Sequence, residues 1–155
     1  MHSLLLPLLL VCREPIADPP KQSQSPGQQA PLSFGSAKID YYWDRIIPLD
    51  MSVDELRVKT IFFNKREIAK GFLKGAQFGT RAQVEVENAS SQPKNPGFAV
   101  AVFDANHNLI GVATGGNKIG VVKPGKTEKF DLNFFQVTER LQRGAYFYIS
   151  VELVK

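Results

Sequence analysis

Runs of alternating apolar and polar residues recur along most of this chain and constrain its fold more than any other feature. Every second residue is apolar in residues 81–87, 130–134 and 147–153, and the residues between them are polar, charged or Tyr. Gly, Pro and Asn residues separate such runs. A period of two is typical of strands with one buried face, and short strands between turns are typical of antiparallel sheets. The sequence therefore predicts an all-β protein.

Further strands bring the expected total to about seven, the number in an immunoglobulin-like sandwich. They lie near residues 39–43, 56–63, 98–103 and 109–114. Residues 98–103 are apolar at both alternating sets of positions, as expected for a central strand that is covered on two faces. We predict an antiparallel immunoglobulin-like β-sandwich over residues 37–155. Residues 68–75 form either a helical turn or a loop in this prediction.

Length and composition limit the remaining possibilities. The chain has 155 residues, of which 43% are hydrophobic and 22% are charged. This length allows one domain of ordinary size and is too short for two. The single Cys excludes an intramolecular disulfide framework and a Cys-based zinc cluster. The net charge of +4 is modest, and we expect no cofactor, no metal and no nucleic-acid partner.

Residues 1–12 form a signal-like segment. The apolar run of residues 4–11 is far shorter than the roughly 20 residues that a membrane-spanning helix needs, and it suits the apolar part of a signal peptide that lacks a basic start. It ends in Leu9-Leu10-Val11-Cys12, which resembles a bacterial lipobox with Val11 in place of a small residue. We predict export to the periplasm or cell surface, with Cys12 as candidate lipidation site for a membrane anchor. A cleaved signal without lipid, or a plain apolar end of a cytosolic protein, is the alternative.

Residues 13–36 are expected to be a linker. They are rich in Pro, Gln and Ser and contain few bulky apolar side chains, so burial cannot offset the entropy lost on ordering. After a membrane-targeting segment, such a composition suits a solvated spacer that holds a folded domain away from the surface. A tail without a role is the alternative.

Residues 120–127 match the phosphate-loop pattern G-x-x-x-x-G-K-T letter for letter. That loop needs a helix after it, so that free N–H groups and the positive helix end meet the phosphates. The residues that follow Thr127 alternate with a period of two, which predicts a strand, and Pro124-Gly125 then forms a β-turn. We reject nucleotide binding here. A phosphate-loop enzyme, which requires a helix from Lys126, stays as an alternative of a different class.

No other motif supports catalysis. Asp104, Asn106 and Asn108 match the first ligand positions of an EF-hand loop, but Leu109 and Gly115 stand where that loop requires Gly and Glu. These residues are instead expected to form a turn between two strands. The one His outside the signal-like segment lies in this turn, without the pattern of a nucleophilic triad. We therefore expect that the protein is not an enzyme.

A basic segment is the first candidate binding surface. Seven basic residues and one acidic residue lie in residues 57–81, and such a patch attracts anions without specificity. We name Lys65, Arg66, Lys70 and Lys74 as candidates for contact with an anionic envelope component. A solvated face without a partner is the alternative.

Three adjacent aromatic residues, Tyr41, Tyr42 and Trp43, are the second candidate surface. In a strand, alternation would turn some of them outward, and exposed Tyr and Trp are common at binding surfaces. The alternative is packing over the end of the sandwich. Separately, Asn88-Ala-Ser90 is a glycosylation sequon, which matters in a eukaryotic host.

Three segments follow one another in an order that resembles a known family. They are Val-Glu-Val-Glu-Asn-Ala-Ser at 84–90, Val-Ala-Val-Phe-Asp at 100–104 with Asn-Leu-Ile-Gly at 108–111, and Val-Lys-Pro-Gly-Lys-Thr-Glu-Lys-Phe at 122–130. This order resembles the FxLyD family of bacterial extracytoplasmic domains, which are immunoglobulin-like sandwiches on exported proteins and lipoproteins. In the naming motif, Val100, Val102 and Phe103 replace Phe, Leu and Tyr, and Asp104 is kept. The resemblance implies an exported β-module and no catalytic residue.

Together these features predict a non-catalytic exported module that binds a partner or acts as a spacer in the cell envelope. An anionic envelope component or another envelope protein is the expected partner. The nearest alternative is a carbohydrate-binding or adhesive domain that uses the aromatic residues at 41–43.

Overall fold

The computed structural model describes residues 33–67, 77–116, 121–135, 137 and 139–153. They form eight strands and one 3₁₀-helix. These are β1 (Phe34–Asp40), β2 (Ile46–Val53), β3 (Leu56–Glu67), β4 (Gln77–Asn88), β5 (Pro96–Phe103), β6 (Leu109–Gly116), β7 (Thr127–Phe134), η1 (Arg140–Arg143) and β8 (Tyr146–Leu153). Within these ranges, no helix has the length and apolar character to cross a membrane. Cys12, the signal-like segment, most of the linker and residues 68–75 lie outside the described residues.

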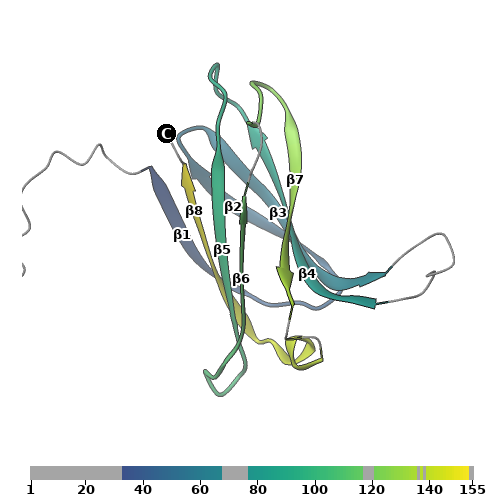
Figure 1. The fold of residues 1–155 in the computed structure, drawn as a ribbon. Helices are drawn as coiled ribbons and strands as arrows, with labels where there is room; N and C mark the ends of the chain where they lie inside the picture. Colours follow the sequence, from purple (N-terminus) through teal and green to yellow (C-terminus); the bar gives the residue numbers. More distant parts are fainter. Residues whose placement is uncertain (1–32, 68–76, 117–120, 136, 138, 154–155) are drawn as a thin grey trace, which may run out of the picture.

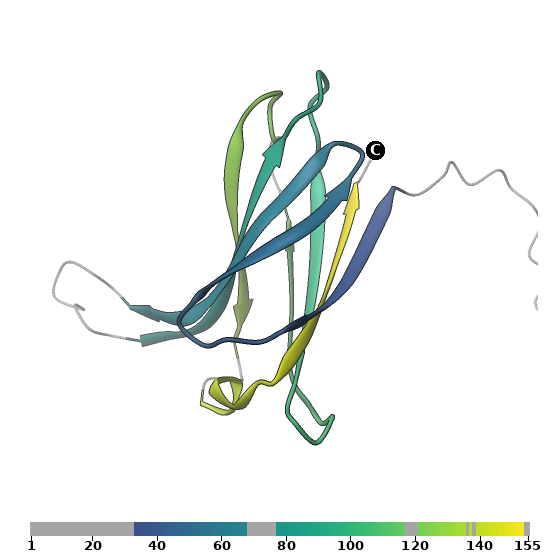
Figure 2. The same ribbon diagram turned by 180° about the vertical axis from the view of Figure 1, so that it is seen from behind.

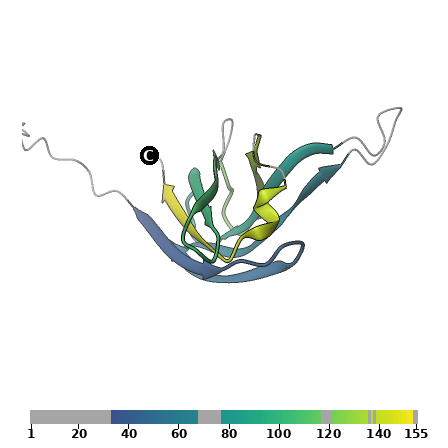
Figure 3. The ribbon, with the colours of Figure 1, turned by 90° about the horizontal axis from the view of Figure 1, so that it is seen from below.

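The strands form two four-stranded sheets (Figure 1). Sheet A has the order β1-β8-β5-β6 and sheet B has the order β2-β3-β4-β7, and all neighbours are antiparallel. From behind, the chain is seen to pass from β1 across the lower part of the molecule into β2 (Figure 2). From below, β1 and the far ends of β3 and β4 lie at opposite sides (Figure 3). The predicted all-β antiparallel sandwich is confirmed.

The core lies between the two sheets, where the apolar half of each alternating run meets its counterpart. Phe147 of β8 and Phe63 of β3 are both fully buried, and their ring centroids are 5.1 Å apart. The ring of Phe63 also lies 4.6 Å from Tyr41 and 6.4 Å from Phe134. Burial of this apolar surface is the main favourable term in folding. Phe63, Phe134 and Phe147 are the largest fully buried side chains of the core.

The sequence did not predict β2, although its residues alternate between exposed and buried. Pro48 interrupts the run and argues against a strand, because Pro cannot donate to a ladder. The structure shows why Pro48 is tolerated. β2 is an edge strand of sheet B, and its register with β3 shifts between Pro48 and Met51.

The first strand also lies earlier than predicted. β1 begins at Phe34, within the predicted linker, and ends at Asp40 rather than at Trp43. Trp43 forms one isolated bridge with Phe63 outside the named strands. β1 contains only two bulky apolar residues, Phe34 and Ile39, but it pairs along its whole length with β8, so tertiary pairing more than an apolar pattern forms this strand.

The predicted two-face coverage of residues 98–103 is wrong. β5 is central in sheet A, and Phe98, Val100 and Val102 face the core. On the other side Ala99 is exposed, and Ala101 and Phe103 are half-buried. This outer side of sheet A is uncovered by any other described element, and its residues form the site described next.

Candidate functional site

The outer face of sheet A carries a cluster of aromatic rings beside a row of small residues. Strand pairing arranges its outward residues in four cross-strand rows. From the η1 end they are Asp40–Tyr146–Phe103–Leu109, Lys38–Tyr148–Ala101–Val112, Ser36–Ser150–Ala99–Thr114 and Phe34–Glu152–Gly97–Gly116. We call this surface the aromatic face.

The rings of the aromatic face contact one another closely. Phe103 and Tyr146 are stacked, with centroids 5.2 Å apart and planes 4° from parallel. The Lys38 ammonium lies 4.1 Å from the centroid of Tyr146, a distance suited to a cation–π contact. Tyr148 stands edge-on to Phe103 and Tyr146, at 5.8 and 6.0 Å. The cluster thus holds Tyr146 between neighbours and leaves Tyr148 45% exposed.

A shallow hollow lies on the same face, over the rows of Ser150 and Glu152, the first of which adjoins the row of Tyr148. It has a volume of about 220 Å³, and its lining includes Gly97, Ala99, Ser150 and Glu152. The small residues Gly97, Ala99 and Ser150 leave the space open. The side chains of Ser150 and Glu152 have no hydrogen bond or ion pair to any residue in the described part of the chain, so their polar groups remain available to a ligand.

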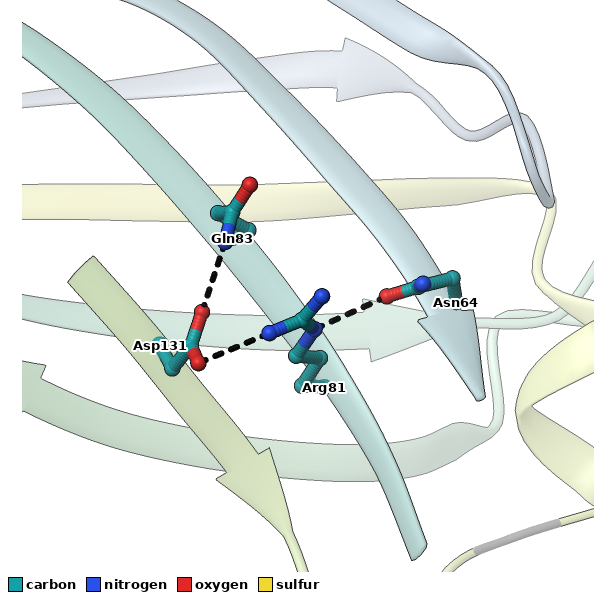
Figure 4. A network of polar contacts seen from close by, with 4 residues as sticks. All are labelled: Asn64, Arg81, Gln83 and Asp131. Carbon is teal, nitrogen blue, oxygen red and sulfur yellow. Dashed lines mark hydrogen bonds and ion pairs between the residues drawn. The ribbon is translucent and has the colours of Figure 1, made fainter. Parts of the chain in front are cut away.

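The outer face of sheet B has a different chemistry, because several of its charges pair across strands. Lys59 contacts Glu87 at 3.5 Å and Lys129 contacts Glu85 at 3.2 Å. A third network is shown in Figure 4. There Arg81 contacts the Asp131 carboxylate at 2.8 Å and donates from Nε to Asn64 at 3.0 Å, while Gln83 donates to Asp131 at 3.0 Å.

These ion pairs reduce the net positive charge of the predicted basic segment. Lys59 and Arg81 lie opposite acidic residues that are remote in sequence, so the excess of positive charge counted along the chain is partly cancelled in space. Lys65 is half-buried and Arg66 is exposed near the far end of β3. Lys70 and Lys74 lie outside the described residues. The anion-binding role of Lys65 and Arg66 stays a prediction.

The structure separates the three adjacent aromatic residues. Tyr41 is 5% exposed and packs in the core, so its side chain is not part of an exposed surface. Its hydroxyl is buried without a hydrogen-bond partner among the described residues, and burial raises the pKa of this phenol far above its usual value. Tyr42 is 49% exposed and Trp43 is half-buried. A binding role for Tyr42 and Trp43 stays a prediction.

The segment from Asp104 to Asn108 is a turn, as predicted. The Asp104 carboxylate accepts hydrogen bonds from the backbone N–H of Asn106 and Asn108, each at 2.9 Å, and from the Asn108 side chain at 3.0 Å. His107 has a left-handed φ of 63°, and its Nδ1 lies 2.9 Å from the Tyr146 hydroxyl. The turn thereby connects to the aromatic face.

These hydrogen bonds make the Asp104 turn sensitive to acid. Hydrogen bonds from the Asn108 side chain and backbone hold the pKa of Asp104 below its ordinary value of 3.8. A lowered pKa means that the carboxylate stabilises the turn above pH 3.8, and that this contribution is lost as the pH falls through the lower, folded-state pKa. We expect an NMR titration to give a pKa below 3.8 for this carboxyl. A value at or above the ordinary one would contradict the prediction, and Asp104→Asn should abolish the low-pH change at Asn108.

The phosphate-loop alternative is wrong. β7 begins at Thr127, where a phosphate loop requires a helix. Gly125 has a left-handed φ of 68°, and the Lys126 N–H donates to the Lys123 carbonyl at 3.1 Å, so residues 123–126 form the predicted turn. The glycosylation sequon at residues 88–90 is inaccessible in this fold. Asn88 is 0% exposed, and its amide donates to the Gln92 and Val122 carbonyls.

No group of His, Cys, Asp and Glu residues in the described ranges could hold a metal ion. The alternation in residues 147–153 predicts that Tyr148 points outward. It does not predict a site there, because Phe103 and Lys38 come from remote segments. No family model matches this chain, and neither does any curated protein.

Proposed function

We propose that this domain is a non-catalytic binding module of the cell envelope and that it binds through the aromatic face. The contrast between the two outer faces of the sandwich carries this proposal. On sheet B, Lys59, Arg81 and Lys129 pair with Glu87, Asp131 and Glu85, so these charges already satisfy one another. On the aromatic face, rings and free polar side chains lie together.

The aromatic face also exposes aliphatic surface. Leu109 and Val112 of β6 are 54% and 53% exposed and lie in the rows of Phe103 and Tyr148. Phe34, 66% exposed, lies at the opposite edge, in the row of Glu152. Single exposed apolar residues are common, but a contiguous group with aromatic rings is typical of interaction sites. Because these side chains add nothing to the core, a ligand is the best reason for their presence.

The sequence supports a place in the envelope. The signal-like segment, the lipobox-like Cys12 and the Pro-, Gln- and Ser-rich residues before β1 suit a domain that is held away from a membrane. The resemblance to exported FxLyD domains agrees with this position and with an immunoglobulin-like form of the sandwich. Another envelope component is then the expected partner.

Photo-crosslinking in the native host tests the binding surface. We would place p-benzoylphenylalanine at Val112 of the aromatic face and, as a matched control, at Ile46, an exposed β-branched residue on an edge strand of sheet B. Irradiation should yield an envelope adduct from position 112 and none from position 46. Adducts from position 46 alone, equal adducts from both, or no adduct from either would refute the proposal.

Intact mass and cell fractionation test the anchor separately. For the full chain we expect a diacylglycerol-sized mass gain on an N-terminal Cys12, together with membrane association. Both should be lost in Cys12→Ala. An unmodified soluble chain that retains Met1 would contradict export and leave the binding face to be judged by crosslinking alone.

A further inference from the structure

Building on the proposed function, we propose that the ligand of the aromatic face is an uncharged carbohydrate chain, with one sugar ring packed on Tyr148 and its hydroxyl groups bound by Ser150, Thr114 and Glu152. The ring, the polar row, the hollow and the charge of this face each support one part of this assignment.

Tyr148 has the position of a stacking platform. Its two aromatic neighbours, Phe103 and Tyr146, both belong to the adjacent row on the η1 side. Toward the row of Ser150, no other described ring contacts it. A Tyr ring offers a broad apolar surface of low conformational entropy, and the C–H face of a sugar ring is flat and apolar. The two neighbouring rings hold Tyr148 in place and so lower the entropy cost of binding.

The row beside Tyr148 carries hydroxyl groups. Ser36, Ser150 and Thr114 lie on β1, β8 and β6 in one cross-strand row, with Ala99 of β5 between the last two. Neighbouring strands are 4.7–4.9 Å apart, so the row spans about 14 Å. Hydroxyls both donate and accept hydrogen bonds, which matches the hydroxyl groups of a sugar. The length of the row allows contact with more than one sugar ring.

The hollow and Glu152 extend this polar row. The volume of 220 Å³ is below the usual range for a site that encloses a whole small molecule, so it suits one ring of a longer chain. Glu152 lies at its edge with a carboxylate that can accept hydrogen bonds from two neighbouring hydroxyls.

Charge argues for an uncharged ligand. The aromatic face carries one cation, Lys38, which lies over the ring of Tyr146, and two carboxylates, Asp40 and Glu152. An anionic chain would meet more negative than positive charge here. A nucleic acid or an acidic polysaccharide requires a basic surface, which this face lacks.

An NMR titration of the ¹⁵N-labelled full chain tests the assignment. The probes are cellopentaose, maltopentaose and an N-acetylglucosamine pentamer, followed by the neutral glycan fraction of the host envelope, freed of protein by protease and of charged chains by anion exchange. We expect shifts at the amides of Tyr148, Ser150 and Thr114 with at least one probe. Tyr148→Ala should weaken binding by at least about tenfold.

Two variants separate loss of the platform from loss of the fold. Tyr148→Phe retains the ring and should keep affinity within about threefold, while Phe62→Ala removes a half-buried ring on sheet B and should leave binding unchanged. Shifts confined to sheet B, no shift with any probe at millimolar concentration, or full affinity in Tyr148→Ala would each overturn the inference.

The crosslinking result separates this inference from the proposed function. A protein adduct at position 112 without any glycan binding would overturn the carbohydrate assignment and leave the binding module standing. Absence of both adduct and glycan binding would overturn both.

Discussion

Phe63→Ala is expected to lower the free energy of unfolding by about 3–5 kcal/mol, the usual cost of removing a buried aromatic ring. Phe63 is 0% exposed and contacts the rings of Tyr41, Phe134 and Phe147 from both sheets. The substitution leaves a cavity at the point where the sheets meet, and the surrounding strands relax only partly to fill it. Since domains are typically stable by only 5–15 kcal/mol, urea unfolding should show a large fall in the midpoint.

The neighbouring Phe62→Ala is the matched control. Phe62 precedes Phe63 in β3, but its side chain is half-buried on the outer face of sheet B, where it lines a hollow with Ile46 and Thr60. The same substitution there should cost no more than about 1.5 kcal/mol, because little buried surface is lost. Equal losses for the two variants would mean that the assignment of inner and outer faces in β3 is wrong.

Asn88→Ala is expected to destabilise the fold by about 2–4 kcal/mol, because it leaves several buried polar groups without partners. The Asn88 amide donates to the carbonyls of Gln92 and Val122, both at 2.8 Å. Its Oδ1 accepts from the N–H and hydroxyl of Ser90, at 3.0 and 2.7 Å. Asn88 thus joins the end of β4 to the loop before β5 and to the segment before β7. Thermal unfolding would measure the loss.

Two further substitutions sharpen this prediction. Asn88→Asp keeps an acceptor for Ser90 but turns a carboxylate oxygen toward two carbonyl oxygens, so at neutral pH it should destabilise at least as much as Asn88→Ala. Asn106→Ala, in the exposed turn after β5, should change stability by no more than about 0.5 kcal/mol. A small effect at Asn88 would show that its hydrogen bonds are replaced by water.

The inner and outer sides of most strands could be predicted from sequence. The alternation in residues 147–153 places Phe147 inward and Tyr148 outward, and the structure confirms both positions. The period of two is a property of the backbone, because successive side chains of any strand point to opposite faces. It does not depend on which strand lies next to it, and local sequence therefore suffices.

The candidate site could not be predicted without the strand order. Tyr146 and Tyr148 come from the last strand, Phe103 from β5 and Lys38 from the first strand, and β8 lies between the other two. The alternation within a strand carries no information about its partner. In the sequence, the three adjacent aromatic residues at 41–43 formed the predicted aromatic surface instead, yet Tyr41 belongs to the core.

The amino-acid sequence by itself determined an all-β chain, the inner and outer sides of most of its strands, and the turns at Asp104–Asn108 and Pro124–Gly125. Tertiary structure decided the strand order, the edge position that tolerates Pro48, the pairing of Arg81 with Asp131, and the gathering of rings on sheet A. The physical reason is the distance along the chain between the residues that determine each feature. Turns and alternation follow from the φ and ψ preferences and side-chain directions of neighbouring residues, whereas pairing depends on the burial and contacts of segments that are remote in the chain.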